Sequence, residues 1–547
     1  MQFGLDRFLN DPALRAPLAG RRVALLAHPA SVTRDLTHAL DALAALPDVK
    51  LTAAFGPQHG LRGDKQDNMV ESPDFADPRL GIPVFSLYGD VRRPTDAMMA
   101  SFDVLLVDLQ DLGCRIYTFI TTLRYVLEAA AQHGKAVWVL DRPNPAGRPI
   151  EGLTLREGWE SFVGAGPMPM RHGMTMGELG HWFIATLGLR VDYRVITMTG
   201  WEPDAAPGFG WPTERSWVNP SPNAANLSMA RAYAGTVMLE GTTLSEGRGT
   251  TRALELFGAP GIDVPRLLAD MRRIAPQWLR GCVLRPCFFE PTFHKHQGQL
   301  CAGVQIHVED PTHYDHAAFK PWRLQALAFR ALRLQAPDYP LWRDFAYEYE
   351  HDRLAIDLIN GGPLLREWVD DVTAAPEVLE AAAAADEAAA RTSFIPLMAI
   401  GIPENAVMAL MLAAFIVKGI QPGPNMIGTH PDLFWGLVAS MWVGNCFLLI
   451  LNVPLVRYWL SVFKIPYTVL FPAILFFCCI GTFSINNNLD DIYITAIFGL
   501  IGYLFLRLGM EAAPLMLGFI LGPMLEENFR RAMLLSRGEF GVFLTRP

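Results

Sequence analysis

Residues 102–113 read FDVLLVDLQDLG, an apolar run that passes directly into polar residues and a glycine. Four other stretches have the same form, namely RRVALLAHPAS (21–31), VKLTAAFGPQHG (49–60), IPVFSLYGD (82–90) and KAVWVLDRPNPAG (135–147). Short, nearly continuous apolar runs are typical of strands that are buried on both faces of a parallel sheet. The sequence therefore predicts an α/β fold.

Segments with a helical pattern separate most of these strands, for example Asp35 to Leu46 and Thr122 to His133. Strands that alternate with helices predict a parallel sheet with helices on both faces. We therefore expect a Rossmann-like doubly wound domain over residues 1–264.

Each predicted strand runs into polar residues, and in open α/β sheets such loops form the ligand-binding crevice. We expect these loops to converge on one site, through His28, Gln58, His59, Tyr88, Gln110, Asp111, Arg142 and Asn144. The first strand is followed by AHPAS and not by a G-x-G-x-x-G turn, which argues against a dinucleotide site. No cofactor is expected.

Residues 235–255, GTVMLEGTTLSEGRGTTRALE, predict a strand and then a glycine-rich loop that carries Glu240 and Glu246. Glycines allow the backbone to approach a ligand closely, and two carboxylates are suited to general acid–base or glycosidic chemistry. The alternative is that one or both glutamates are solvated surface charges, because six residues of separation do not place them on one side.

Residues 265–390 predict a smaller α/β domain, with helices at VPRLLADMRRIA (264–275) and PWRLQALAFRALRLQ (321–335) and a strand at CAGVQIHVED (301–310). The same region contains CFFEPTFHKHQGQLCAGVQIH (287–307), a loose group of possible metal ligands with Cys287, His294, His296, Cys301 and His307. Their spacing matches no standard zinc pattern, so we expect no metal site.

Charge and hydropathy divide the chain near residue 394. The 154 residues from Phe394 onward hold eight of the 46 basic and eight of the 55 acidic residues, so the net charge of −9 belongs to the part before them. Four long apolar spans, at residues 394–417, 433–456, 466–483 and 492–523, predict an all-α transmembrane segment of four to five helices over 394–547.

The N-terminal region has scattered charges and no signal-peptide pattern, so we expect a cytoplasmic soluble part. Seven irregularly spaced cysteines fit reduced thiols, and the acidic balance argues against nucleic acid as a partner. Arg457 and Lys464 follow the second span, whereas the acidic SINNNLDD (484–491) follows the third. The positive-inside rule then places the connection between the second and third spans in the cytoplasm. Counting back two crossings puts the soluble part on the cytoplasmic side of the inner membrane as well.

A series of motifs in residues 1–390 closely resembles the exo-β-N-acetylmuramidase (NamZ-type) family. They are FGPQHGLRGD (55–64), DLQDLGCRIYTF (108–119), LDRPNPAG (140–147), PMRHGMTMGEL (169–179), WVNPSPN (217–223), EGTTLSEGRGTTRALELFGAP (240–260) and FFEPTFHKHQGQLCAGVQIHV (288–308). The resemblance implies a Rossmann-like catalytic domain, a smaller domain, and a cleft that removes non-reducing-end N-acetylmuramic acid (MurNAc) from peptidoglycan fragments, with a muropeptide or MurNAc-GlcNAc as substrate.

Carried over residue by residue, the resemblance implies catalytic roles for Glu246, Glu240 and Asp111. It implies substrate contacts for Gln58, His59, Arg115, Tyr117, Asn144, His172, Asn223 and Arg248. One position departs from the family, whose first motif often reads Gly-Pro-Glu-His-Gly where this chain has Gln58. An amide cannot exchange a proton at neutral pH, so Gln58 either orients water or substrate, or marks a loss of catalysis.

Three motifs near the C-terminus, FIPLMAIGIPENAVMAL (394–410), GIQPGP (419–424) and MLGFILGPMLEENFRRAMLLSRGEFGVFLTRP (516–547), resemble the large membrane subunit of tripartite tricarboxylate transporters. We expect only the C-terminal portion of such a subunit, unable to transport alone and joined to the soluble part either by gene fusion or by a mistaken joining of two reading frames. Three hypotheses result: a glycosidase for cell-wall recycling, a muropeptide-binding protein that has lost catalysis, and a tricarboxylate transport component with a soluble appendage.

Overall fold

The computed structural model describes residues 1–390 apart from 64, 66–68 and 207–209. The chain divides into two units, Met1–Arg391 and Thr392–Pro547, and the second lies outside the described residues. The predicted apolar spans between residues 394 and 523 and the topology inferred from Arg457 and Lys464 therefore fall outside them too. Within the described ranges, no helix is both long enough and apolar enough to cross a membrane.

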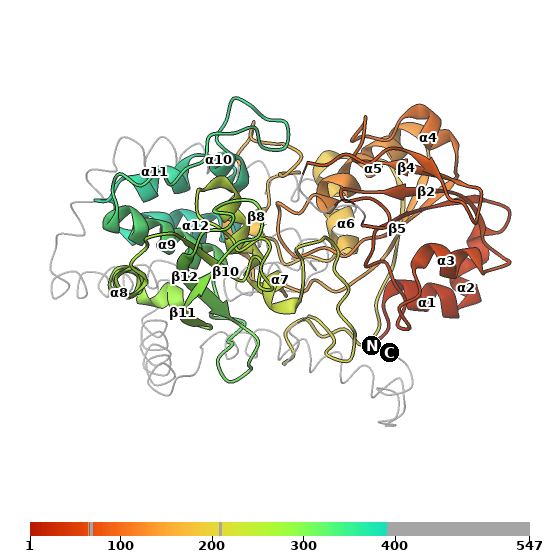
Figure 1. The fold of residues 1–547 in the computed structure, drawn as a ribbon. Coiled ribbons are helices and arrows are strands. Elements are labelled where there is room, and N and C mark those ends of the chain that lie inside the picture. The colour runs from red at the N-terminus through yellow and green to blue at the C-terminus, as the bar shows by residue number, and fades with distance from the viewer. Residues whose placement is uncertain (64, 66–68, 207–209, 391–547) are drawn as a thin grey trace, which may run out of the picture. The chain divides into compact units, whose positions relative to one another are not determined.

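The first half of the unit holds a seven-stranded sheet in the order β3-β4-β2-β1-β5-β6-β9 (Figure 1). Its strands are β1 (Arg22–Ala27), β2 (Lys50–Gly56), β3 (Phe75–Ala76), β4 (Pro83–Ser86), β5 (Val104–Asp108), β6 (Ala136–Leu140) and β9 (Asp192–Ile196). All neighbours pair in parallel except β3, which is antiparallel to β4 at the edge. The six parallel strands, taken in chain order, lie in the Rossmann order 3-2-1-4-5-6.

Helices cover both faces of this sheet, because its central strands are buried along almost their whole length. They are α1 (Gly4–Asn10), α2 (Pro12–Arg15), α3 (Ala39–Ala44), α4 (Asp96–Ala100), α5 (Phe119–His133) and α6 (Met176–Leu187), with a 3-10 turn η1 (Ala16–Leu18). Val23 and Leu25 pack with α1 and α3 on one face, whereas Ala24 and Leu26 share a core with α4 and α5 on the other. The prediction of a parallel sheet covered on both faces is confirmed.

A second, smaller sheet has the antiparallel order β10-β12-β11, with β10 (Leu256–Ala259), β11 (Val283–Phe289) and β12 (Cys301–His307). The helices around it are α7 (Leu227–Thr236), α8 (Val264–Ile274), α9 (Pro321–Gln335), α10 (Ala355–Asn360), α11 (Leu364–Asp370) and α12 (Pro376–Ala390), with 3-10 turns η2 (Val237–Gly241) and η3 (Pro276–Leu279). A two-stranded ribbon, β7 (Glu151–Thr154) and β8 (Pro169–Arg171), packs against α12. The domain boundary expected at 264 stays a prediction.

The strand predicted at the start of residues 235–255 is wrong, because this segment is the end of α7 followed by η2. Close packing decides the conformation here. A Cβ on Gly235 would stand 2.1 Å from the carbonyl oxygen of Pro321 at the start of α9. Only a residue without a side chain lets the two helices approach this closely, and this contact overrides the β propensity of Val237 and its neighbours.

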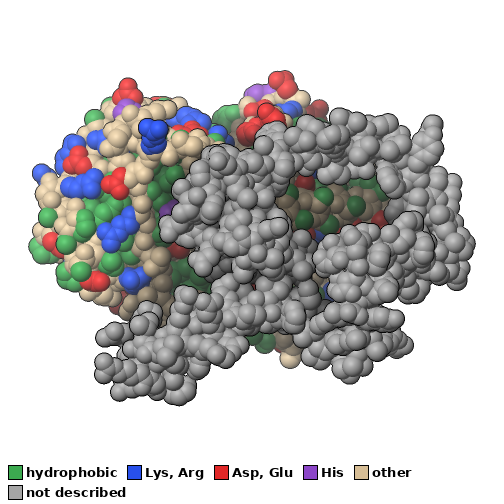
Figure 2. All heavy atoms as spheres, turned by 180° about the vertical axis from the view of Figure 1, so that it is seen from behind, with side chains coloured by type: hydrophobic (Ala, Val, Ile, Leu, Met, Phe, Trp, Pro, Cys, Tyr) green, Lys and Arg blue, Asp and Glu red, His purple; other side chains and the backbone are tan. Residues whose placement is uncertain are grey.

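Charges are mixed on the described surface that Figure 2 displays, where lysine and arginine side chains alternate with aspartate and glutamate over an otherwise polar and apolar face. Such interspersed charge is typical of an ordinary solvated surface.

Candidate active site

A pocket lined mostly by buried residues lies beside the carboxyl ends of β2 and β5 and is completed by segments of the second half of the unit. Its lining comprises Gln58, His59, Ile116, Tyr117, Thr118, Phe119, Val163, Ser221, Pro222, Asn223, Met229, Tyr233, Glu240, Arg248, Leu254, Tyr347 and Glu348. Of the residues predicted from sequence, Gln58, His59, Tyr117, Asn223, Glu240 and Arg248 meet here. Most of the lining side chains are polar, and convergent polar groups in a pocket fix the orientation of a bound small ligand.

Glu240 presents a firmly held carboxylate to this pocket. Its Oε1 accepts from Arg248 Nη2 at 2.5 Å, and its Oε2 accepts from the hydroxyl of Tyr347 at 2.7 Å. Arg248 is only 3% exposed, so this charge-assisted hydrogen bond is shielded from water. The same arginine donates through Nε to Glu246 Oε1 at 2.7 Å, which links the two glutamates of the glycine-rich loop through one cation.

Glu246 lies behind Arg248 and is not part of the pocket lining. Lys295, from the hairpin between β11 and β12, reaches its Oε2 at 2.7 Å. Complete burial by itself would raise the pKa of Glu246, but Lys295 and Arg248 outweigh it and hold that pKa well below its usual range. Glu246 is therefore a fixed negative charge that positions Arg248.

Glu348 is a pocket residue that the sequence did not single out. It lies in the turn Tyr347–Glu350, is 7% exposed, and accepts from the hydroxyl of Tyr88 at 2.8 Å and from Gln58 Nε2 at 3.4 Å. Burial and then the charge of Glu240 raise its pKa from 4.5 to about 7. The only signal in the sequence is the short run YEYE (347–350), which matches no motif.

Gln58 bridges two groups of the pocket wall. Its Oε1 accepts from Thr118 Oγ1 at 2.6 Å, while its Nε2 points to Glu348. The amide uses its acceptor on one side and its donor on the other, a combination that a carboxylate at this position could not supply without a proton.

Strained backbone gathers around the pocket. His59, Leu254 and Glu348 line it with φ values of 70°, 63° and 47°, in the left-handed region that non-glycine residues seldom adopt. Tyr349 follows with φ 69°. Such conformations persist where the surrounding structure holds a functional side chain in place.

Asp111 and His172 form a buried pair that does not line the pocket. His172 Nε2 lies 3.0 Å from Asp111 Oδ2, which also accepts from the amide of Gly113, while His172 Nδ1 accepts from the amide of Met174. Because Nδ1 is an acceptor, the proton of the neutral ring is on Nε2 and points at Asp111. The pair supports the loop from which Tyr117 enters the pocket.

Arg115 and Asn144 also lie outside the lining. Arg115 is fully buried and donates to the carbonyl oxygens of Leu153, Met168 and Ile359. Asn144 donates to the carbonyl of Met174 and accepts from the amide of Ala146. These side chains tie loops together, and their substrate contacts stay a prediction.

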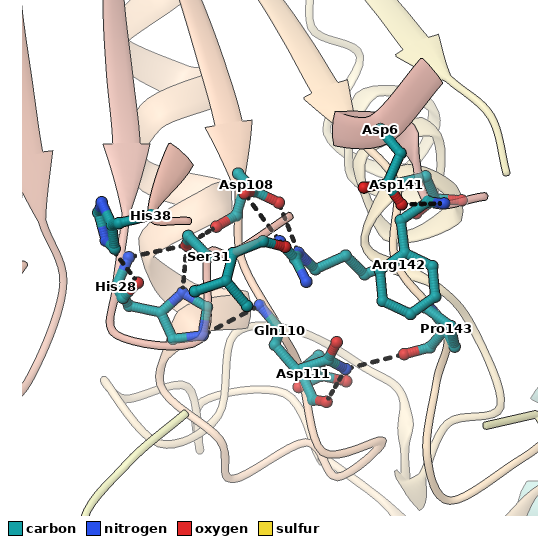
Figure 3. A network of polar contacts seen from close by, with 12 residues as sticks. Asp6, His28, Ser31, His38, Asp108, Gln110, Asp111, Asp141, Arg142 and Pro143 are labelled. Atoms are coloured by element: carbon teal, nitrogen blue, oxygen red, sulfur yellow. Dashed lines mark hydrogen bonds and ion pairs between the residues drawn. The ribbon is translucent and has the colours of Figure 1, made fainter. Parts of the chain in front are cut away.

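The loops after β1, β5 and β6 form a separate polar network (Figure 3). His28 Nδ1 lies 2.7 Å from Ser31 Oγ, and the backbone N–H of Gln110 donates to His28 Nε2. Arg142 forms a buried bidentate pair with Asp108. Burial, with Arg142 nearby, lowers the pKa of His28 well below its usual value. Protein side chains thus occupy the crevice between β1 and β5, and the ligand pocket lies beside β2 and β5 instead.

The glycine-rich loop and the possible metal ligands have structural surroundings. A Cβ on Gly247 would stand 2.5 Å from Leu256, and one on Gly249 would stand 2.2 Å from Thr292. These two glycines therefore let the loop pack closely against neighbouring protein residues. Cys287 and Cys301 pack with Leu256 and Phe289, and His296 bonds the carbonyl of Thr243. The described residues include no cluster of three or more candidate metal ligands, and their four cysteines are free thiols.

A pair of glutamates in one buried pocket on an α/β scaffold is the arrangement that glycoside hydrolases use to cleave a glycosidic bond. Models of the exo-β-N-acetylmuramidase NamZ N-terminal and C-terminal regions match residues 23–228 and 231–392. The chain belongs to the exo-β-N-acetylmuramidase NamZ family. It is 42% identical over 311 residues to the peptidoglycan β-N-acetylmuramidase NamZ of Bacillus subtilis (strain 168), which covers 57% of this chain and 73% of that protein.

Solved structures share the fold. A DUF1343 family protein from Bacteroides fragilis NCTC 9343 is 28% identical with a TM-score of 0.61, covering 71% of this chain and 96% of the other. A second DUF1343 family protein from the same organism, 24% identical with a TM-score of 0.51, is similar in fold.

The C-terminal part matches a different family. The tripartite tricarboxylate transporter TctA family model covers residues 371–517. An uncharacterised protein of Agrobacterium vitis, from the TAR-II ttuC′ 3′ region, is 56% identical over 163 residues, which make up 30% of this chain and 67% of that protein. The resemblance of this chain to two unrelated families, predicted from its motifs, is confirmed.

Proposed function

We propose that this protein is an exo-acting glycoside hydrolase that releases non-reducing-end MurNAc from peptidoglycan fragments during cell-wall recycling. The observation that carries the proposal is the pocket with Glu240 and Glu348, two carboxyl groups in opposite electrostatic surroundings. A glycosidase needs such a difference, because one group must give a proton while the other acts as a carboxylate. Membership of the NamZ family supports the choice of sugar.

In this proposal Glu240 is the carboxylate that faces the anomeric carbon or its attacking water. Arg248 and Tyr347 fix its orientation, and Glu246 fixes Arg248. Gln58, His59, Tyr117 and Asn223 contact the sugar from the pocket wall. Asp111, His172, Arg115 and Asn144 act from behind by holding the loops that carry those contacts.

The proposal is tested with the purified full-length chain and two disaccharides, MurNAc-GlcNAc and GlcNAc-MurNAc. We expect release of free MurNAc from the first and no cleavage of the second, because the enzyme acts on MurNAc at the non-reducing end. Glu240→Gln should lose at least a hundredfold in rate, as expected for a group that takes part in the chemical step. Absence of MurNAc release from MurNAc-GlcNAc would contradict the proposal.

Gln58 supports a second candidate, a muropeptide-binding protein without catalysis. In that case the pocket binds MurNAc-GlcNAc and leaves it intact, and restoring a glutamate at position 58 raises turnover by orders of magnitude. We favour an active enzyme, because Glu348 supplies a protonatable carboxyl group beside Gln58.

For the C-terminal part we propose an inner-membrane fragment, on the strength of the TctA match over residues 371–517. The muramidase part then lies on the cytoplasmic side. A cysteine introduced at Asn487, with the native cysteines removed, should react with an impermeant thiol reagent in intact cells, and labelling only after lysis would contradict this orientation. A third candidate, tricarboxylate transport, would require citrate uptake by cells that make this chain with its partner subunits, and we expect none.

A further inference from the structure

The turn that carries Glu348 places a carboxyl group in the pocket without a cation beside it. Glu348 is 7% exposed, and among the described residues no lysine, arginine or histidine lies within ion-pair distance of it. Its direct partners are the hydroxyl of Tyr88 and the amide of Gln58. Each partner can hydrogen-bond a neutral carboxyl group as well as a charged one.

Burial and the charge of Glu240 favour the neutral form of Glu348, whereas its hydrogen-bond donors Tyr88 and Gln58 and the cation Arg92 oppose them. Glu240 and Tyr347 come from the second half of the unit, and Tyr88 comes from the loop after β4. Arg92 is a nearby cation that lowers the pKa of Glu348, and its guanidinium stacks over the ring of Tyr88 at 4.0 Å. Burial and the charge of Glu240 together prevail over these contributions and raise the pKa to about 7.

We propose that Glu348 is the proton donor for the departing sugar and that Gln58 and Tyr88 are its positioning residues. This inference rests on the proposed function and assigns the acid in that reaction. Glu348 lines the same pocket as Glu240, so one sugar bound there can contact both groups. Arg248 neutralises Glu240 and leaves Glu348 as the group that keeps a proton.

The proton of Glu348 passes to the glycosidic oxygen as the bond between that oxygen and the anomeric carbon breaks. The electron pair of the broken bond stays on the oxygen, and the remaining sugar leaves as an alcohol. Water supplies the new oxygen at the anomeric carbon, and one proton of that water restores the protonation state of the site. The products are MurNAc and the shortened fragment, with one water consumed.

This assignment explains how the site accommodates an amide at position 58. Gln58 accepts from Thr118 and donates toward Glu348, so it fixes the carboxyl group without competing for its proton. A glutamate in that place would be a third carboxyl group beside Glu348 and Glu240. Gln58 is therefore compatible with an active enzyme.

The test compares two substrates on the full-length chain. In MurNAc-GlcNAc the leaving group is a hydroxyl oxygen of GlcNAc, which needs a proton to depart. In 2,4-dinitrophenyl β-MurNAc the leaving group is a stable phenolate, which needs none. We expect Glu348→Gln to lower kcat on the disaccharide roughly 10²- to 10⁴-fold and to stay within about tenfold of wild type on the aryl glycoside. Glu350→Gln is the matched control, because Glu350 belongs to the same turn and pairs with Arg353; it should retain wild-type rates.

Equal losses of Glu348→Gln on both substrates, or no loss on either, would overturn the inference while the wild-type chain still cleaves the disaccharide. A wild-type chain that cleaves neither substrate would overturn the proposed function and the inference with it. Tyr88→Phe gives a second readout that needs no loss of the carboxyl group. It removes a hydrogen bond that lowers the pKa of Glu348, so the alkaline limb of kcat/KM should move to higher pH; an unchanged limb would overturn the role of Tyr88.

Discussion

Two glutamates of this protein, Glu246 and Glu348, are both buried but differ in the charge of their partners and in the direction of their pKa shifts. Two cations, Arg248 and Lys295, hold the carboxylate of Glu246 and lower its pKa far below the usual value. Glu348 has neutral partners and a negative neighbour, and its pKa is about 7. Burial alone therefore does not decide the protonation of a carboxyl group, because the groups that surround it can reverse the effect.

The difference assigns different work to the two positions. Glu246, whose carboxylate pairs with two cations, stays charged and holds Arg248 in position. Glu348, which titrates near neutrality, can exchange a proton in a reaction. The following predictions test this contrast, beginning with the cation that connects Glu246 to the pocket.

Arg248→Ala should have the largest effect. It leaves the carboxylates of Glu240 and Glu246 buried without their shared cation, and breaking such a pair lowers the free energy of unfolding by about 3–5 kcal/mol. Chemical denaturation of the full-length chain measures this loss. Arg273→Ala on α8 is the control, since Arg273 is exposed, pairs with Asp270 at the surface, and should contribute about 1 kcal/mol or less. Equal effects of the two substitutions would contradict the contrast.

Glu348 should make stability depend on pH. Its pKa is about 7 in the folded state and 4.5 ordinarily, so the folded state holds the proton over a range in which the unfolded state has lost it. The stabilising contribution is complete below pH 4.5 and disappears as the pH rises through 7, a change of about 3 kcal/mol. Denaturation at pH 4.5 and pH 8 should show that Glu348→Gln becomes more stable relative to wild type by this amount, and a constant difference would argue against a neutral Glu348.

Gln58→Glu should have a smaller effect, on the pH profile. A second carboxyl group beside Glu348 disfavours its charged form and raises its pKa, by about one unit or 1.4 kcal/mol. The alkaline limb of kcat/KM should therefore move to higher pH, while the rate at pH 6 changes less than tenfold. A rise in turnover by orders of magnitude would instead mean that Gln58 is a defect, as the binding-protein hypothesis requires.

The sequence predicted the sheet well because its information is local. Each buried strand is a short apolar run, and the five runs that were singled out became β1, β2, β4, β5 and β6. Six predicted site residues also line the pocket, including Glu240 and Gln58, because their motifs lie at strand ends and in one loop.

Glu348 could not be found in the same way. Its pKa depends on Tyr88 and Gln58, which are 260 and 290 residues away in the chain. Glu246 and Arg115 were candidates because of their motifs, yet the structure surrounds both with protein groups that satisfy their charge or hydrogen bonds. Which of several glutamates keeps a proton is decided by tertiary contacts, and a sequence pattern does not contain them.

The most direct measurement is the dependence of kcat/KM on pH from 4 to 9, because kcat/KM reports the pKa values of the free enzyme. With MurNAc-GlcNAc as substrate, the wild-type chain should lose activity as the pH rises through about 7, where Glu348 gives up its proton. With 2,4-dinitrophenyl β-MurNAc, whose leaving group needs no proton, this alkaline limb should be absent both in the wild-type chain and in Glu348→Gln. With MurNAc-GlcNAc, a wild-type profile that stays flat from pH 6 to 9 would contradict the account. An alkaline limb on the same substrate that survives unchanged in Glu348→Gln would also contradict it.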